Sequence, residues 1–200
     1  NLSLCETNGG MLPEQIHTAT KTVHKKFPQI SLGIHAHNDS ELAVANTLSA
    51  IKSGADLVQG TLNGFGERTG NANLCSIIPN LALKMGYDFE PKIDLRQLTS
   101  LSVYVSEVAN MPPSARLPYV GSNAFAHKAG VHVAAVAKNP KSYEHVNPLL
   151  VGNQRQTVVS ELAGRTNILM MAKDLGMDLK KDSPLTQKIL TAVKKLESEG

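Results

Sequence analysis

The sequence predicts an α/β fold over residues 1–87 and a mainly helical arrangement over residues 88–200. In the first part, short apolar runs alternate with longer runs whose apolar residues recur at helical spacing. This pattern is typical of strand and helix units that build a parallel sheet. Gly and Pro residues separate the runs. In the second part the helical spacing continues without intervening strands, which indicates a different substructure.

Three strand and helix units are expected in the first part. The strands are short apolar runs, and they cover residues 2–5, 31–37 and 56–61. The first helix begins at Pro13, because proline is tolerated in the first turn, and it ends before Pro28. The third helix covers residues 72–85, is interrupted at Pro79 and ends at Gly86.

The second helix of this part follows the strand at residues 31–37. Asp39 or Ser40 is expected to cap it, because their side-chain oxygens accept hydrogen bonds from free amides of the first turn. Gly54 is expected to end it. The residues expected to face the core are apolar and spaced at helical intervals: Leu42, Ala45, Leu48, Ala50 and Ile51.

Three parallel strands cannot close a barrel, and they would leave two long edges without hydrogen-bonding partners. We therefore expect the chain to be a piece of a larger barrel. A small open three-layer sheet is the alternative. It is less attractive because the first strand starts at residue 2 with nothing before it to cover its edge.

Four helices are expected in the second part, at residues 95–109, 127–138, 166–175 and 184–196. Asp94 is positioned to cap the first of them, and Pro112 and Pro113 break it. Residues 118–123 are expected to form a loop before the second helix.

Composition narrows the classes of function. Hydrophobic residues make up 42% of the 200 residues, which is enough for one sizeable core, and no apolar run is long enough to cross a membrane. The first residues do not resemble a signal peptide, and only Cys5 and Cys75 are present, so a cytoplasmic location is expected. The net charge of +3 comes from scattered Lys and Arg, which argues against a nucleic-acid partner.

His35 and His37 form the most informative motif. In a strand, alternate side chains point to the same face, so the two imidazoles project together while Ala36 points away. Because capping residues follow directly, the pair lies at the C-terminal end of its strand, where an α/β barrel has its catalytic mouth. Two imidazoles on one face can share a metal ion. Alternatively, both imidazole rings only form hydrogen bonds with backbone groups.

Four blocks of the chain resemble, in family order, the acyl-CoA-condensing synthases that include 2-isopropylmalate, homocitrate and citramalate synthases. The blocks are residues 5–10 (CETNGG), 35–39 (HAHND) with 42–46 (LAVAN), 60–71 (GTLNGFGERTGN) and 123–132 (NAFAHKAGVH). Further segments are most similar to the branch that condenses pyruvate with acetyl-CoA, namely residues 73–80, 138–145 and 159–168.

The resemblance implies the C-terminal portion of a TIM (β/α)8 barrel, with its last three strands present, followed by helical linker subdomains. It implies an acyltransferase that condenses acetyl-CoA with an α-keto acid, here pyruvate, to give citramalate for isoleucine biosynthesis. The resemblance also implies that the protein is a homodimer. The earlier barrel strands are expected to lie outside this sequence.

The resemblance also implies a divalent metal ion held by His35 and His37, with Asn71 as a candidate third ligand and a family Asp ligand outside this sequence. Two imidazoles with oxygen donors suit Zn, Mn or Mg, so the identity of the metal stays open. An ion with open positions can bind the keto acid through its carbonyl and carboxylate oxygens and polarise the carbonyl.

Three further side chains match family positions with roles in substrate binding or catalysis. Thr7 matches the position that hydrogen-bonds the keto acid's carboxylate, although alone it reads as an ordinary loop hydroxyl. His132 matches a histidine that moves a proton of the acetyl group from the partner subunit; alone it reads as a packed or surface residue. Tyr143 is expected near the thioester, and its ordinary role is that of an amphipathic anchor.

The Gly-rich loop at residues 63–71 has two interpretations. Gly64, Gly66 and Arg68 can contact acetyl-CoA, because glycines allow close backbone approach and exposed amides suit anions. Alternatively, the glycines only permit a tight turn, and Glu67 pairs with Arg68.

The chain departs from the family at Glu41, where Gly is usual. A carboxylate is expected there in the first turn of the following helix, where it favours the helix dipole.

Other functions stay open. A 2-isopropylmalate or homocitrate synthase would use the same site with another keto acid. Hydroxymethylglutaryl-CoA lyases share the barrel and the His pair, but they carry a cysteine in the Gly-rich loop, whereas here Cys75 sits on the following helix. The chain alone is expected to be inactive, and a purely structural or dimerising fragment is the last alternative.

Overall fold

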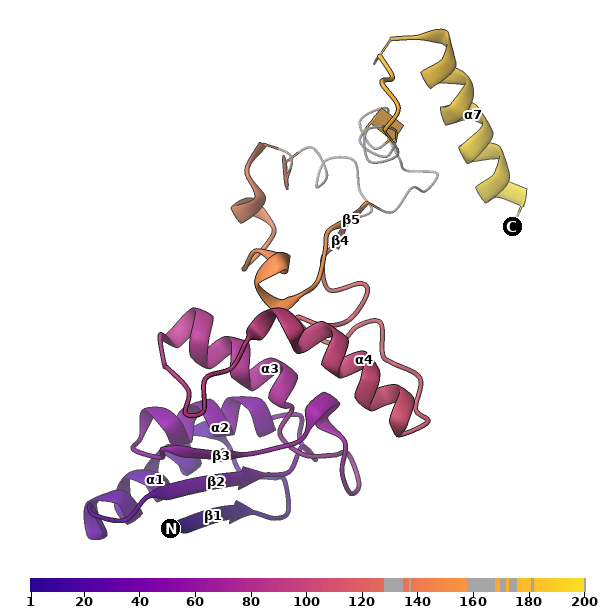
Figure 1. Ribbon diagram of the computed structural model, residues 1–200. Coiled ribbons are helices and arrows are strands. Elements are labelled where there is room, and N and C mark those ends of the chain that lie inside the picture. Colours follow the sequence, from indigo (N-terminus) through magenta and orange to yellow (C-terminus); the bar gives the residue numbers. More distant parts are fainter. Residues whose placement is uncertain are drawn as a thin grey trace.

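The computed structural model describes residues 1–127, 135–136, 138–157, 168–169, 172, 176–180 and 182–199. Strands β1 (Leu2–Glu6), β2 (Leu32–Ala36) and β3 (Leu57–Gln59) form a parallel sheet with β2 in the centre (Figure 1). Leu2 pairs with Leu32, and Gly33 pairs with Leu57. All three predicted strands are confirmed, each within two residues of its expected ends.

Helices α1 (Pro13–Lys26) and α2 (Ala43–Lys52) pack on one face of this sheet. Alternate residues of β2 point to that face and are buried in two adjoining clusters: Leu32, Ile34 and Ala36. Across the sheet from the helices, Cys5, Leu57 and Gln59 are exposed. The parallel sheet is therefore covered on one side only within the described part of the chain, as expected for a piece of a barrel wall.

The helix predicted at residues 72–85 is confirmed with a change of geometry at its proline. Helix α3 (Leu74–Pro79) continues directly into a π-helical turn (Asn80–Lys84), and Gly86 follows with φ of +71°. Pro79 has no amide hydrogen to donate to the preceding turn, so the regular α-helical ladder is interrupted there. The left-handed conformation of Gly86 explains why the helix stops.

The predicted cap of α2 is wrong. The helix begins at Ala43, and the side-chain oxygen that accepts from the Ala43 amide belongs to Asn38 (3.2 Å). The Ser40 hydroxyl donates instead to the carbonyl of Gly9, and Asp39 is paired with Arg68. Both expected caps therefore have tertiary partners. Ala45 was also expected in the core but is exposed, because the buried face contains Ala43, Asn46, Thr47 and Ala50.

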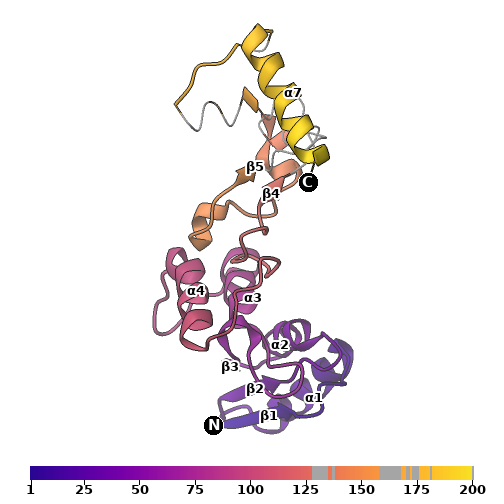
Figure 2. The same ribbon diagram turned by 90° about the vertical axis from the view of Figure 1, so that its right-hand side faces the viewer.

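The second part begins with a 3-10 turn (Leu95–Gln97) that runs into α4 (Leu98–Val108). The predicted cap is confirmed, because the Asp94 carboxylate accepts from the amide of Arg96 (3.1 Å). The final predicted helix is α7 (Pro184–Glu199). Figures 1 and 2 place α7 at the end of the molecule opposite the sheet.

Strands β4 (Ala126–His127) and β5 (Gln156–Thr157) pair in parallel, although no strand was expected after residue 88. Strands of two residues carry no periodic signal, so the sequence could not reveal them. His127 was wrongly placed at the start of a helix. Much of the helices predicted at 127–138 and 166–175 lies outside the described residues.

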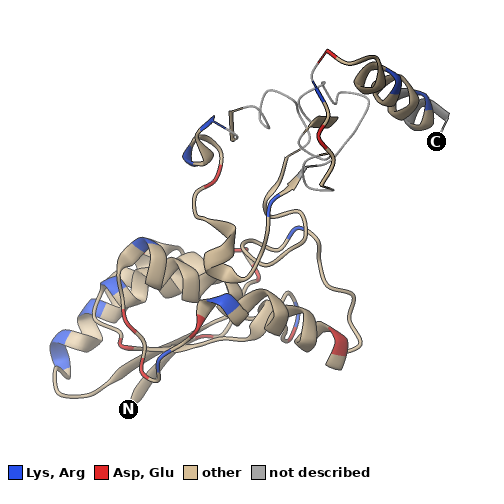
Figure 3. Ribbon diagram, turned by 45° about the horizontal axis from the view of Figure 1, so that its top comes forward, with Lys and Arg blue, Asp and Glu red and all other residues tan. Residues whose placement is uncertain are grey.

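One apolar cluster joins the end of the first part to the second. It contains the buried residues Cys75, Leu98, Tyr119, Val120, Phe125 and Val151. Val151 ends the 3-10 turn η5 (Pro148–Val151), and another short 3-10 turn, η4 (Pro140–Ser142), precedes it in the chain. In the described part of the chain, no helix is both long and apolar enough to span a membrane. Lys and Arg lie on several elements, interspersed with Asp and Glu (Figure 3).

Glu41 has a left-handed backbone, with φ of +61°, and it lies ahead of α2 rather than in the first turn of that helix. The expected interaction with the helix dipole is therefore wrong. A left-handed conformation disfavours every residue with a Cβ, because the Cβ approaches the following carbonyl oxygen. Glycine would adopt this conformation without that cost.

We predict that Glu41→Gly stabilises the full-length protein by about 0.5–1 kcal/mol, because relief of the left-handed strain exceeds the added entropy of the unfolded chain. Urea unfolding measures the change. The matched control is Glu14→Gly in the first turn of α1, where glycine should cost about 1 kcal/mol. Equal destabilisation by both substitutions would contradict the interpretation.

Candidate metal centre

The C-terminal ends of the three parallel strands and the loops that follow them form the candidate site. The Gly-rich loop folds back so that Asn71 lies beside His37 in an isolated antiparallel bridge. Two backbone hydrogen bonds fix the loop in this position. The amide of Asn38 donates to the carbonyl of Gly70 (3.0 Å), and the amide of Ala72 donates to the carbonyl of Ala36 (2.9 Å). The backbone therefore fixes the end of the Gly-rich loop beside the end of β2.

His35 and His37 project from β2 and its C-terminal extension to the face opposite Ile34 and Ala36. Their ring centroids are 5.3 Å apart and the rings meet edge to face at 66°. The two imidazoles are therefore close enough for one ion to lie between them. This arrangement follows from strand alternation, because the intervening Ala36 is fully buried against the helices.

Two atoms of this cluster are buried without a hydrogen-bond partner among the described residues: Nδ1 of His37 and Oδ1 of Asn71. Leaving such groups unsatisfied costs about 1–3 kcal/mol each. The Asn71 amide nitrogen donates to the carbonyl of Phe65 (3.2 Å), which leaves its oxygen as the free ligand atom. A bound cation would satisfy both atoms, so the residues present fit a metal ion.

Within the described residues, no group of three or more His, Cys, Asp or Glu side chains is arranged to hold a metal ion. The candidate ligand set is thus two imidazoles and one amide oxygen. Zn, Mn and Mg differ in their preference for nitrogen and oxygen, and a mixed set of this kind does not select among them.

Arg68 joins the loops that follow all three strands. Its Nε donates to Oδ1 of Asp39 (2.7 Å), and its Nη2 donates to Oδ2 of the same carboxylate (2.9 Å). Nη2 also donates to the carbonyl of Thr7 (2.8 Å). The hydrogen bonds from Arg68 lower the pKa of Asp39 below its ordinary value. The partner of Arg68 is therefore Asp39, and the suggested structural pairing with Glu67 is wrong.

The glycines of the loop permit close packing inside it. Gly70 has φ of +97°, and a Cβ there would collide with the carbonyl oxygen of Gly64, which itself has φ of +73°. A Cβ at Gly66 would collide with the amide nitrogen of Asn71. Gly66 therefore allows Asn71 to take its position beside His37.

The remaining predicted residues are more widely spaced. The exposed Thr7 hydroxyl lies 3.5 Å from the carbonyl of Cys5. Tyr143 is 48% exposed and directly follows η4, in a segment separated from the sheet by α3 and α4 (Figures 1 and 2). The structure therefore does not bring Tyr143 to the His pair within one chain. His132 lies outside the described residues.

Asn63 has a structural role that sequence reasoning missed. It has a left-handed backbone at φ of +61°, and its amide nitrogen donates to the carbonyl of Ser102 (2.8 Å) and the hydroxyl of Ser106 (3.0 Å). The Ser102 hydroxyl donates back to the Asn63 side-chain oxygen (2.6 Å). The Gly-rich loop is thus fastened to α4. Asparagine tolerates positive φ, and this property was the one sequence feature that could have indicated a left-handed backbone at this position.

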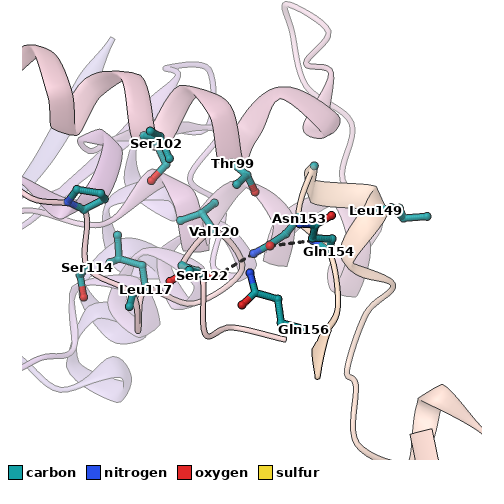
Figure 4. A pocket seen from close by; sticks show the side chains of 15 residues that line it. Thr99, Ser102, Ser114, Leu117, Val120, Ser122, Leu149, Asn153, Gln154 and Gln156 are labelled. Atoms are coloured by element: carbon teal, nitrogen blue, oxygen red, sulfur yellow. Dashed lines mark hydrogen bonds between the residues drawn. The ribbon is translucent and has the colours of Figure 1, made fainter. Parts of the chain in front are cut away.

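A pocket of about 470 Å³ lies next to this fastening, between α4 and the segments at 113–122 and 149–156 (Figure 4). Ser102 lines it, and the side chain of Asn153 in its wall donates to the carbonyls of Tyr119 and Gly121 (2.9 and 3.0 Å). None of the predicted site residues in the described part of the chain lines the pocket. It is therefore distinct from the candidate metal centre.

Comparisons with known proteins agree with this architecture. The HMGL-like family model matches residues 1–105, and the model described as homocitrate synthase post-HMGL domain-like matches residues 119–200. A solved structure of an HMG-CoA lyase from Acinetobacter baumannii, in complex with coenzyme A and 3-methylmalate, is 25% identical with a TM-score of 0.50. That similarity covers 56% of this chain and 38% of the lyase. The fold is therefore a partial α/β barrel, as predicted.

The chain belongs to the HMGL-like family. Among its curated relatives, the (R)-citramalate synthase of Aquifex aeolicus is 55% identical over 98% of this chain and 37% of that protein. The (R)-citramalate synthase of Synechocystis is 50% identical over 100% of this chain and 38% of that protein. The chain thus spans less than two fifths of the length of these relatives.

We predict that Gly66→Ala weakens metal binding by the full-length protein about 10- to 100-fold, because the new methyl group displaces the Asn71 amide. Titration calorimetry with Zn²⁺ and Mn²⁺ measures the affinity. Gly86→Ala is the control: it strains a left-handed residue far from the site, so it should lower stability and leave the affinity unchanged. Equal affinities of wild type and Gly66→Ala would contradict the assignment of Asn71 as a ligand.

Proposed function

We propose that the chain is part of a metal-dependent acyltransferase that condenses acetyl-CoA with pyruvate to form citramalate, a step of isoleucine biosynthesis. The observation that carries the proposal is the pair of buried, unpartnered ligand atoms on His37 and Asn71 beside His35. The 55% and 50% identity to (R)-citramalate synthases supports the choice of pyruvate. We further propose that the whole protein is a cytoplasmic homodimer.

In this proposal His35, His37 and Asn71 hold the divalent ion. Enzymes of the HMGL-like family are generally dependent on a divalent metal. When bound, such an ion supplies Lewis-acid polarisation of a carbonyl group. The face of β2 that carries the imidazoles is free of covering helices in the described part of the chain, so a small keto acid has access to it.

Thr7 is proposed to donate its hydroxyl proton to the carboxylate of the keto acid. Its backbone is held by Arg68, so the direction of the hydroxyl is limited although the side chain is exposed. The amides of Gly64 and Gly66 and the guanidinium of Arg68 are proposed to contact acetyl-CoA. The charge of Arg68 is partly compensated by Asp39, so it would assist as one of several anion-binding groups.

His132 and Tyr143 are proposed to act on the acetyl group of the neighbouring protomer's substrate. His132 would take a proton from the methyl carbon, the resulting carbanion would attack the ketone carbon of pyruvate, and the ketone oxygen would take up a proton as it becomes the hydroxyl of the product. Water would then hydrolyse the thioester and release CoA as the free thiol. Tyr143 is half-exposed, as a group that reaches into a partner's site must be. In the same proposal, residues 1–87 form the barrel portion and residues 88–200 form the linker subdomains.

A lyase is the competing function, since the solved lyase has the same fold. The Gly-rich loop contains no cysteine. Cys75 is fully buried, and burial raises the pKa of its thiol above the usual value. A protonated, enclosed thiol is a poor nucleophile and a poor acid-base group. The described site therefore favours condensation over thiol-dependent cleavage.

Thioester consumption by the full-length protein tests the proposed function. With pyruvate, 2-oxoisovalerate and 2-oxoglutarate offered in parallel, we expect pyruvate to give the highest kcat/KM by at least about tenfold, equivalent to about 1.4 kcal/mol of transition-state discrimination. The 200-residue chain alone should be inactive. Preference for either of the other acids would indicate a 2-isopropylmalate or homocitrate synthase, and turnover by the chain alone would refute the need for further strands.

A further inference from the structure

The pocket between α4 and the segments at 113–122 and 149–156, which we call the α4 pocket, lies outside the candidate metal centre (Figure 4). Its volume of about 470 Å³ is typical of a small-molecule site. All the side chains that line it are uncharged in the part of the chain that the structure describes. A carboxylate or phosphate group that entered the pocket would lose its hydration without gaining a cation, which is costly. The pocket therefore does not suit the anionic substrates of the proposed reaction, and it favours an uncharged ligand.

The neutrality of the pocket follows from the direction of its side chains. Gln154 and Gln156 line it, whereas Arg155, which lies between them in the chain, pairs with Glu144 (2.7 Å). The chain enters β5 at this point, and consecutive side chains of an extended segment point to opposite sides. The guanidinium is therefore directed away from the pocket.

The lining combines apolar surface with hydrogen-bonding groups. The apolar part includes Val103, Leu117, Val120 and Leu149. Two hydroxyls and two carboxamides of the lining have no hydrogen-bond partner among the described residues: those of Ser114, Ser122, Gln154 and Gln156. A carboxamide presents a donor and an acceptor together, so it can pair with another amide through two hydrogen bonds. The ligand that matches this lining has an apolar body and an amide group.

The walls of the α4 pocket are held in place by the protein itself. Thr99 in α4 donates its hydroxyl proton to the carbonyl of Val151 (2.7 Å). The side chain of Asn153 donates to the carbonyls of Tyr119 and Gly121 (2.9 and 3.0 Å). These bonds fix the three walls relative to one another. Because the walls need little further ordering, a small ligand loses less of its binding free energy to conformational entropy.

One wall of the pocket is connected to the candidate metal centre. The hydroxyl of Ser102, in that wall, donates to the side-chain oxygen of Asn63 (2.6 Å). Asn63 directly precedes Gly64, whose carbonyl accepts a hydrogen bond from the amide of Asn71 (3.0 Å). The wall and the candidate metal ligand are therefore linked by one side-chain hydrogen bond and one hydrogen bond within the Gly-rich loop.

We propose that the α4 pocket binds an uncharged, amide-bearing ligand, and that this ligand strengthens metal binding through Ser102, Asn63 and Asn71. Ligand binding by the pocket is independent of the proposed function, whereas its effect on the metal rests on the proposed metal site. A ligand in contact with Ser102 limits the movement of α4 against the Gly-rich loop, and a metal ion on Asn71 limits the movement of the same loop. Each of them reduces the ordering cost of the other, so both affinities rise by the same factor.

Titration of the full-length protein with benzamide, followed by saturation-transfer NMR without metal, tests the pocket. Benzamide has an apolar ring and one amide group, and we expect a Kd on the order of 1 mM for a molecule of its size. Benzoate and benzamidine have the same ring with a negative and a positive group. Both should bind the pocket at least about tenfold more weakly, because neither charge has a partner there.

Two variants locate the binding. Ser122→Phe places a ring inside the pocket and should abolish the binding of benzamide, whereas Ser100→Phe, at an exposed position of α4 outside the lining, should leave it unchanged. Gln154→Glu adds a carboxylate to the lining with little change of shape. It should weaken the binding of benzamide and strengthen that of benzamidine, and its exposed position makes a failure to fold no obstacle to the test.

Titration with Mn²⁺ tests the connection to the metal centre. Saturating benzamide should raise the Mn²⁺ affinity about fivefold, and saturating Mn²⁺ should raise the benzamide affinity by the same factor. Ser102→Ala removes the hydrogen bond to Asn63 and keeps the wall. In this variant, benzamide should bind within about twofold of wild type, and the effect of each ligand on the other should disappear.

Absence of benzamide binding would overturn the proposal, and so would equal binding by wild type, Ser122→Phe and Gln154→Glu. A Mn²⁺ affinity that does not respond to benzamide, or that responds equally in Ser102→Ala, would overturn the connection to the metal centre. A protein that binds no Mn²⁺ would overturn that connection together with the proposed metal site, while the titration with benzamide still decides the pocket. Loss of the proposed condensing activity alone would contradict only the proposed function.

Discussion

The alternation of side chains along β2 is the constraint on which the candidate site depends. Ile34 and Ala36 must face the helices because they fill the core, so His35 and His37 must face the other way. A shift of one residue in the register would bury both imidazoles and expose the core residues. Parallel pairing with β1 and β3 on both sides fixes that register, and the geometry of the imidazoles follows from it.

Around this strand the structure uses backbone contacts to bring ligand atoms together. The return of the Gly-rich loop places Asn71 beside His37, and its glycines allow the close approach that this return needs. Asn63 then ties the same loop to α4, and Arg68 ties it to the loops after β1 and β2. The loop is therefore held from several directions, which limits the movement of a candidate ligand that has no regular secondary structure of its own.

Much of this architecture could be predicted from the sequence where the signal is local. The strands and helices of residues 1–86 have strong periodicity and glycine or proline ends, and the cap at Asp94 was equally visible. The pairing of Asp39 with Arg68 could not be predicted, because the two residues are 29 positions apart. An aspartate that caps a helix and one that pairs with a distant arginine have the same local sequence. The left-handed backbone of Glu41 was hidden for a similar reason, since the residue type does not favour it. The His pair could be found from spacing, whereas the orientation of the Asn71 oxygen required the folded loop.

We propose that His35, His37 and Asn71 hold one metal ion. Anomalous diffraction from crystals of the full-length protein grown with Zn²⁺ or Mn²⁺ tests it most directly. We expect a single strong peak about 2.0–2.2 Å from a ring nitrogen of each histidine and from Oδ1 of Asn71. A protein that binds the metal with no peak beside these three residues would contradict it.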